Sequence, residues 1–216
     1  MVFVRLYEAT TNSSSKKTTL SIGQEFSGEE GVVIWDAALV LAKYLETFID
    51  GHPWKRALEL GAGTGFIGLL AGVTLGIDCL ITDVSSIRPL IEKNVKRNAS
   101  AVKDGVQLIP FTLDWNQPPS LGSLPFQCFD LILLSDGIYY EAGIEPLVSV
   151  LHSYSTKDTD ILIAYEVRPD KDYILEKFLK LVEPIFNVKK VVDGLDPVYS
   201  CDDIFLFHLN KKNEGI

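Results

Sequence analysis

The chain has 216 residues, a formal net charge of −9 and a hydrophobic fraction of 47%. This length is typical of one domain, and the apolar fraction is sufficient for a buried core. An acidic surface disfavours binding to the phosphate backbone of nucleic acids and favours a basic partner. The sequence has no apolar run of about 18 residues, so we expect no membrane span.

The start of the sequence lacks the basic segment and long apolar core of a secretory signal. Cys79, Cys128 and Cys201 are odd in number and widely spaced. They match neither a disulfide framework nor a zinc site, and they fit a reducing compartment. We therefore expect a cytoplasmic protein. Nothing in the sequence argues against a monomer.

The N-terminal region alternates apolar and polar residues, which predicts a β-hairpin. The expected elements are strands at residues 2–7 and 18–22 and polar loops at residues 11–17 and 25–30. We expect this region, residues 1–30, to be an accessory to a core at residues 31–210 within a single domain.

The core alternates short apolar segments with segments of helical periodicity. Helices are expected at residues 36–49, 64–75, 85–98, 145–154 and 170–182, and strands at residues 57–60, 77–82, 106–111, 129–134, 160–165, 185–192 and 203–209. This alternation predicts an α/β, Rossmann-like sheet of seven strands that is mostly parallel, with an antiparallel last strand. Neither a repeat nor a second domain is indicated.

Trp35 directly precedes the first predicted helix, where Asp36 would serve as an N-cap or a first-turn acid. The indole would either pack into the core or form a wall of a ligand pocket. The sequence leaves these two interpretations open.

Gly61, Ala62 and Gly63 follow the first core strand and precede a helix. Glycine accepts positive φ and allows a ligand to approach the backbone closely. Asp83 lies about 20 residues further on, where an acid commonly accepts hydrogen bonds from ribose hydroxyls. The pattern predicts a nucleotide site, and it is shared by proteins that bind NAD, FAD and S-adenosylmethionine.

Glu59, two residues before Gly61, discriminates between these ligands. A carboxylate there would repel a pyrophosphate and attract an ammonium or a sulfonium, at about 4 kcal/mol for charges roughly 4 Å apart. This favours S-adenosylmethionine. Alternatively, Glu59 caps backbone amides of the turn. Because residues 63–68 also fit the dinucleotide fingerprint, an NAD(P)-binding oxidoreductase stays open.

Trp115 follows the predicted strand at residues 106–111 and would either cover an adenine ring or pack in the core. The strand at residues 129–134 leads into Ser135, Asp136, Tyr139 and Tyr140. Ligands of open α/β sheets bind outside the carboxyl ends of strands, so these residues form a candidate site.

Glu166 and Arg168 follow the strand at residues 160–165. They would either contact a substrate or form a structural ion pair with each other. The three histidines are scattered, and none pairs with a cysteine or serine for nucleophilic catalysis.

Residues 33–38, 59–65 and 136–140 carry a family resemblance. The chain resembles the seven-strand S-adenosylmethionine-dependent methyltransferases, and in particular the small lysine methyltransferases that act on chaperones, elongation factors and AAA ATPases. Asp136 and Tyr139 match the Asp-x-x-Tyr signature of that family. The resemblance implies S-adenosylmethionine as cofactor, no metal, and a protein substrate such as a chaperone or an AAA ATPase. A methyltransferase-like protein that binds a partner without catalysis is the remaining alternative.

By this resemblance, the cofactor contacts carry over to Trp35, Glu59, Gly61, Ala62, Gly63, Asp83, Trp115 and Ser135. The family usually has alanine at the position of Ser135, a small difference if the backbone makes the contact. The Asn/Asp-Pro-Pro-Tyr motif of DNA and glutamine methyltransferases is absent from this strand end. Residues 116–119, which read Asn-Gln-Pro-Pro, lie elsewhere and are not equivalent to it.

The implied reaction is in-line displacement of a methyl group by a neutral lysine amine. Deprotonating a free lysine, whose pKa is near 10.4, costs about 4 to 5 kcal/mol at pH 7. Asp136 would hold the amine and orient its lone pair, and Tyr139 would accept a hydrogen bond or line the channel. We expect Tyr140 and Glu166 to contact the substrate, and positioning to supply roughly 7 to 11 kcal/mol.

Overall fold

The computed structural model describes residues 2–11, 16–25, 32–169 and 171–213. Its larger sheet has seven strands: β3 (Arg56–Leu60), β4 (Asp78–Asp83), β5 (Leu108–Thr112), β6 (Leu131–Ser135), β7 (Asp160–Glu166), β8 (Phe186–Lys190) and β9 (Ile204–Lys211). The spatial order is β5-β4-β3-β6-β7-β9-β8. Most of the loop at residues 11–17 and of the loop at residues 25–30 lies outside the described residues.

Strand pairing confirms the predicted fold. Strand β3 pairs in parallel with β4 and β6, and β6 pairs in parallel with β7. Strand β9 is antiparallel to both of its neighbours, β7 and β8. The last strand is therefore the antiparallel one, as expected for this Rossmann-like α/β arrangement.

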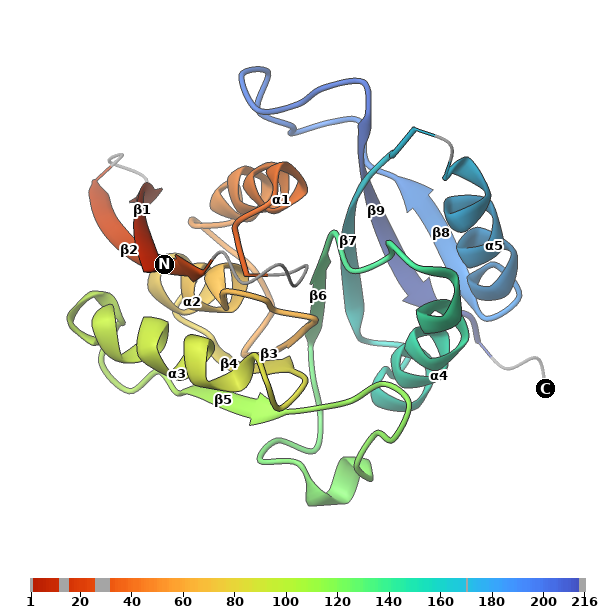
Figure 1. The fold of residues 1–216 in the computed structure, drawn as a ribbon, viewed down its shortest axis with the longest axis horizontal. Helices are drawn as coiled ribbons and strands as arrows, with labels where there is room; N and C mark the ends of the chain where they lie inside the picture. Colours follow the sequence, from red (N-terminus) through yellow and green to blue (C-terminus); the bar gives the residue numbers. More distant parts are fainter. Residues whose placement is uncertain (1, 12–15, 26–31, 170, 214–216) are drawn as a thin grey trace.

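Helices cover both faces of the sheet (Figure 1). They are α1 (Asp36–Glu46), α2 (Phe66–Thr74), α3 (Arg88–Arg97), α4 (Ile144–Tyr154) and α5 (Asp172–Val182). Helices α1, α2 and α3 pack on one face, and α4 and α5 pack on the other. Because both faces are buried, the central strands are almost entirely apolar. Along β3, Ala57 faces the first group of helices, whereas Leu58 and Leu60 face the second.

Four predicted helices are longer than the observed ones, and two of them differ by three residues at one end. Helix α1 ends at Glu46 and not at residue 49, and the Thr47 hydroxyl that follows donates to the carbonyl of Tyr44. Helix α3 begins at Arg88 and not at residue 85, because Pro89 is tolerated only in the first turn of a helix. Among the described residues, no helix is both long enough and apolar enough to cross a membrane.

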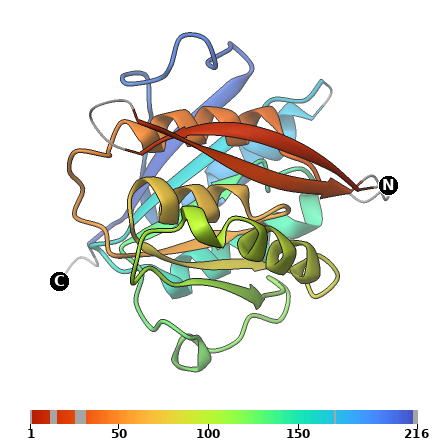
Figure 2. The same cartoon turned by 90° about the vertical axis from the view of Figure 1, so that its left-hand side faces the viewer.

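The N-terminal hairpin consists of β1 (Val2–Thr10) and β2 (Lys17–Glu25), which extend further than the predicted strands. It forms a separate two-stranded sheet that lies across the outer side of the helices on one face (Figure 2). Two buried asparagines of α3 dock it: Asn98 Nδ2 donates to the Ser21 carbonyl, and Asn94 exchanges two hydrogen bonds with the Gly23 backbone.

Candidate active site

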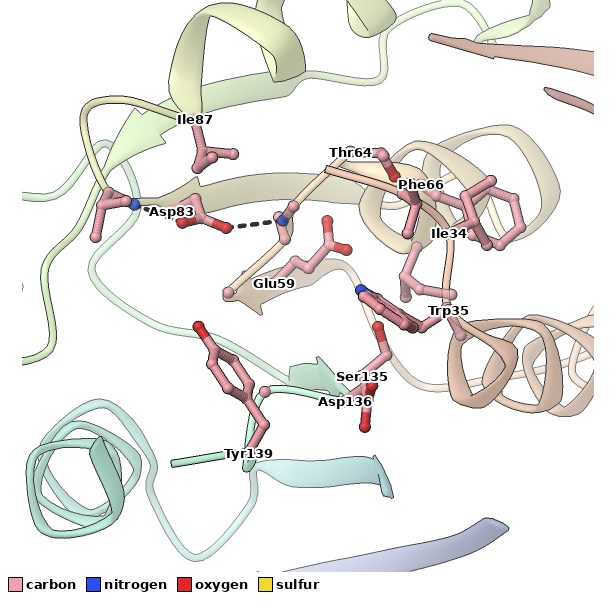
Figure 3. Close-up of a pocket in the computed structure, with 18 of the residues that line it drawn as sticks. Ile34, Trp35, Glu59, Thr64, Phe66, Asp83, Ile87, Ser135, Asp136 and Tyr139 are labelled. Atoms are coloured by element: carbon pink, nitrogen blue, oxygen red, sulfur yellow. Dashed lines mark hydrogen bonds between the residues drawn. The ribbon is translucent and has the colours of Figure 1, made fainter. Parts of the chain in front are cut away.

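A cavity of about 270 Å³ opens at the carboxyl ends of β3 and β6. The chain leaves β3 toward α2 on one face and leaves β6 toward α4 on the other, so the two connections diverge and a crevice opens between them. The predicted site residues that line this cavity are Trp35, Glu59, Gly61, Ala62, Gly63, Asp83, Trp115, Ser135, Asp136, Tyr139 and Tyr140. Figure 3 shows how several of them surround the same space.

The glycine loop requires its glycines. Gly61, Gly63 and Gly65 have φ angles of 57°, 54° and 74°, which side-chain-bearing residues rarely adopt. A Cβ atom on Gly61 would lie 3.1 Å from Cζ2 of Trp115. Half-buried Trp115 contacts the apolar core and also lines the cavity, so it packs in the core as one interpretation held, while its cover over an adenine ring stays a prediction.

Glu59 lies on the face of β3 that α2 covers, and it is only 2% exposed. Its Oε2 atom accepts a hydrogen bond of 2.9 Å from the N–H of Gly68, in the first turn of α2. Glu59 therefore caps backbone amides, as the alternative interpretation held, and it also lines the cavity. Burial raises the pKa of this carboxyl to about 8, because a charged form is poorly solvated there.

Close packing explains Gly68, the glycine that completes the dinucleotide fingerprint. A Cβ atom on it would lie 2.6 Å from Glu59 Oε2 and 2.7 Å from Ile81 Cγ1. Helix α2 can approach β3 and β4 this closely only with glycine at that position. The fingerprint match is thus accounted for by helix packing, without a dinucleotide.

Asp83 ends β4 and directs its carboxylate toward the glycine loop (Figure 3). Oδ2 accepts from the N–H of Gly63 at 2.7 Å, and Oδ1 accepts from the N–H of Val84 at 2.7 Å. Burial raises the pKa of Asp83. Each oxygen has capacity for a second donor, so ribose hydroxyls can be accommodated in addition to these backbone contacts.

Trp35 occupies the N-cap position of α1 with an extended backbone and is half-buried at the cavity wall. Asp36 is the first-turn acid of this helix, and no side-chain cap is formed. The guanidinium carbon of Arg168 lies 5.1 Å from the centre of the Trp35 ring, a distance typical of a cation–π contact.

Asp136 directly follows β6, and its side chain is 1% exposed. Among the described residues other than glycine, it alone has a positive φ, of 49°. Its Oδ2 atom accepts a hydrogen bond of 2.5 Å from Nη2 of Arg168. The ion pair described for Arg168 therefore joins β6 to β7 and does not involve Glu166, the partner that the sequence suggested.

Two neighbouring tyrosines line the cavity. The ring centres of Tyr139 and Tyr140 are 4.9 Å apart. Tyr140 is 40% exposed and packs over Gly143, where a Cβ atom would lie 2.5 Å from its Cζ. This part of the wall is thus aromatic, and burial raises the pKa of the Tyr140 hydroxyl.

Glu166 is the one expected site residue that is not among the described residues lining the cavity. It ends β7, is partly buried, and has a pKa raised first by burial and then by the nearby Asp136 carboxylate. Glu166 is therefore not part of the described cavity wall, although Arg168, two residues further on, is.

Sequence reasoning missed several residues of the cavity wall. They are Val33, Ile34, Ala38, Thr64, Phe66, Ile67, Val84, Ser86, Ile87, Leu113, Asp114, Asn116 and Gly137. Most follow a strand end or flank Trp35, which is the signal that would have found them. Arg168, which the sequence suggested as a substrate contact or a member of an ion pair, also lines the cavity. Asn116 belongs to the stretch that was set aside, yet it lines the cavity and donates to Asp114.

Comparison with known proteins places this site in a family context. The sequence model of a family described as lysine methyltransferase matches residues 14–184. Protein N-lysine methyltransferase METTL21A of Mus musculus is 34% identical over 182 residues, which cover 84% of this chain and 78% of the mouse protein. The Danio rerio protein of the same name is 34% identical over 160 residues, covering 74% of this chain and 70% of that protein.

Solved structures share the fold at low sequence identity. A methyltransferase from Pyrococcus furiosus superposes with a TM-score of 0.59 at 19% identity, covering 89% of this chain and 90% of that one. A TehB-like SAM-dependent methyltransferase from Corynebacterium glutamicum gives a TM-score of 0.57 at 18% identity, covering 84% and 90%. These likenesses confirm the Rossmann-like methyltransferase fold.

Proposed function

Because the chain belongs to the lysine methyltransferase family and S-adenosylmethionine is its cofactor, we propose that it methylates a lysine ε-amine of a chaperone or an AAA ATPase. We further propose that it acts in the cytoplasm as a monomer with a single domain spanning residues 1–216. Protein-lysine methylation itself follows from the family and from the names of similar proteins.

Three sequence features favour an AAA ATPase among these substrates. Residues 35–46, the Tyr139–Tyr140 pair and the Tyr165-Glu166-x-Arg168 stretch resemble the valosin-containing protein lysine methyltransferase. A competing substrate is suggested by EEF1A lysine methyltransferase 3 of Xenopus tropicalis, which is 29% identical over 163 residues. Its name indicates an elongation factor.

The residues of the cavity fit S-adenosylmethionine. Glu59 presents a buried carboxylate beside the glycine loop, which would bind the ammonium group and offset the sulfonium charge. A Cβ atom on Gly61 would crowd the Trp115 ring, so glycine at this position leaves the backbone of the loop open to contact the ligand. Asp83 would accept from the ribose hydroxyls, and Trp35, Trp115 and Ser135 would complete the walls. The oxidoreductase alternative loses its support, because the chain belongs to the lysine methyltransferase family and helix packing accounts for Gly68.

In the proposed mechanism, the bound cofactor supplies an electrophilic methyl group. Tyr139 and Tyr140 would surround the lysine side chain and exclude water, which lowers the pKa of its amine. Asp136 would accept one N–H of the amine and so direct the lone pair toward the methyl group. Proximity of the two reactants would contribute roughly 7 to 11 kcal/mol, so neither a metal nor a covalent intermediate is required. Glu166, two residues before Arg168 of the cavity wall, would contact the segment that flanks the target lysine.

One observation supports this proposal above the others: Asp136 and Tyr139 line the same cavity as the glycine loop. The test is transfer of isotopically labelled methyl from S-adenosylmethionine to proteins of a cell lysate, with mass spectrometry to locate the modified residue. We expect a labelled lysine in an AAA ATPase or a chaperone with wild type, and strongly reduced labelling with Asp136→Ala. Binding of S-adenosylhomocysteine without any labelling of lysine would overturn the proposal, and a labelled elongation factor would redirect it.

A further inference from the structure

Arg168 connects two walls of the cavity that lie far apart in the sequence. Its Nη2 donates to Oδ2 of Asp136, at the acceptor end, and its guanidinium lies 5.1 Å from the ring centre of Trp35, at the cofactor end. Arg168 itself lines the cavity. Its side chain is 26% exposed, whereas that of Asp136 is 1% exposed, so the carboxylate of this ion pair is nearly inaccessible to water.

A buried carboxylate beside the acceptor creates a difficulty for the reaction. Lysine attacks only as the neutral amine, but a nearby anion favours the ammonium form. The effect is strong in a poorly solvated site, since the attraction between opposite charges grows as the effective dielectric falls. Asp136 is therefore useful as a hydrogen-bond acceptor and harmful as an uncompensated charge.

The charges described around Asp136 indicate that Arg168 is placed to provide the compensation. Glu166 and Tyr165, both on β7, interact electrostatically with Asp136, and Asp36 at the start of α1 and Asp203 before β9 interact with Glu166. The acids in this group would add negative charge. Among the described residues, the positive charge that contacts Asp136 is the Arg168 guanidinium.

We propose that Arg168 is a positioning residue that cancels the charge of Asp136, so that Asp136 accepts a hydrogen bond from the target amine without holding it as an ammonium. This inference rests on the proposed function. Arginine suits the role because it stays protonated, its planar fork fixes the carboxylate, and its face can stack on the Trp35 indole. Lysine would keep the charge but lose the fork and the stacking.

The pH profile of methyl transfer tests the proposal. We would measure kcat, at saturating protein substrate from the lysate experiment, from about pH 6 to about pH 10 for wild type, Arg168→Gln and Arg168→Lys, because kcat reports the pKa of the amine in the bound complex. In Arg168→Gln the acid limb should move up by about one pH unit or more, with a roughly tenfold loss near pH 7 that is recovered at high pH. Arg168→Lys should stay close to the wild-type profile in position, though with a lower plateau.

A double variant separates charge compensation from a purely structural role. In Asp136→Asn/Arg168→Gln both charges are absent, so the acid limb should return toward the wild-type position even if the plateau rate is low. It also provides the test if Arg168→Gln alone does not fold, since no unpaired charge remains buried. A loss that is uniform across pH, or an acid limb in the double variant that stays displaced, would overturn the proposal.

The two proposals fail in different ways. If the wild-type protein binds S-adenosylhomocysteine but labels no lysine, the proposed function is wrong. If the wild type labels lysine and the acid limb of Arg168→Gln does not move, only the role assigned to Arg168 is wrong. Calorimetry with S-adenosylhomocysteine on each variant would confirm that the cofactor site is intact.

Discussion

Oε1 of Gln24 accepts a hydrogen bond of 2.6 Å from the backbone N–H of Ile34. The backbone carbonyl of Ile34 accepts a second hydrogen bond, of 3.2 Å, from Nη1 of Arg5. Gln24 and Arg5 lie in the N-terminal hairpin, whereas Ile34 lines the cavity and directly precedes Trp35. The hairpin, which the sequence suggested to be an accessory, thus fixes the segment that walls the cofactor end of the cavity.

Replacing Gln24 with leucine should therefore weaken both stability and cofactor binding. Gln24 is 3% exposed, so its removal leaves the Ile34 N–H buried without its acceptor, at about 1 to 3 kcal/mol. We expect a several-fold weaker affinity for S-adenosylhomocysteine, measured by calorimetry, alongside urea unfolding. Thr19→Ala, on the exposed face of the same hairpin, is the control and should change neither. Reduced stability with unchanged affinity would limit the hairpin to a structural role.

A pair of glycine variants can separate backbone strain from loss of the site. Gly61 and Gly105 both have positive φ, but only Gly61 faces a cavity residue, since nothing lies within 4 Å of a Cβ atom on Gly105. Alanine at either position should destabilise the fold by about 1 kcal/mol or more. Only Gly61→Ala should also lose affinity for S-adenosylhomocysteine, by at least about tenfold, because its Cβ displaces Trp115. Equal affinities of the two variants for S-adenosylhomocysteine would contradict the assignment of the glycine loop at Gly61 as a cofactor contact.

Much of this site is predictable because strand ends of a parallel sheet meet at one edge. The glycine loop, Asp83 and the stretch from Ser135 to Tyr140 each follow an apolar run, and they converge as expected. The pairing of Asp136 with Arg168 was not predictable. It depends on the adjacency of β6 and β7 and on a positive φ at Asp136.

Two other features also escaped sequence reasoning for physical reasons. Strand β7 ends at Glu166, so the chain changes direction before Arg168, and the alternation that orients strand residues no longer applies. The contact between Gln24 and Ile34 joins a hairpin to a loop through a side chain and a backbone group. Neither a glutamine nor an isoleucine in the sequence predicts such a contact.

The stability of the protein should depend on pH through Glu59. Burial raises its pKa to about 8 in the folded state from an ordinary value of 4.5, so the folded state binds a proton that the unfolded state releases. The resulting stabilisation is complete below about pH 4.5 and is lost as pH rises toward 8. Glu59→Gln should abolish this dependence, so the variant should gain a few kcal/mol relative to wild type between about pH 5 and about pH 8.

Urea unfolding of both proteins at several pH values checks this expectation. Asp83 also has a raised pKa, but it is present in both proteins and cancels in the difference. Glu59→Gln should additionally bind S-adenosylhomocysteine more weakly by about tenfold or more, since the ammonium loses its carboxylate. A stability difference that is constant with pH would show that Glu59 is not buried as a proton-binding group.

Asp160 provides a stability test that is independent of the active site. It begins β7, at the end of the sheet opposite the cavity, and joins β7 to β9 and to the segment before β3. Its carboxylate accepts from Trp54 Nε1 at 2.7 Å. On β9, it accepts from Asn210 Nδ2 at 2.9 Å and contacts His208 Nε2 at 2.7 Å. The hydrogen bond with His208 is the main cause that lowers the pKa of Asp160 to about 2.

This lowered pKa stabilises the fold by about 2 kcal/mol above pH 4, and the stabilisation is lost as pH falls toward 2. Asp160→Asn should therefore unfold at lower urea concentration at neutral pH, and the gap to wild type should close in acid. Affinity for S-adenosylhomocysteine should stay at the wild-type value, because the cavity is formed at the other ends of the strands. Weaker binding in a variant that is still folded at the assay temperature would mean that the two ends of the sheet are coupled.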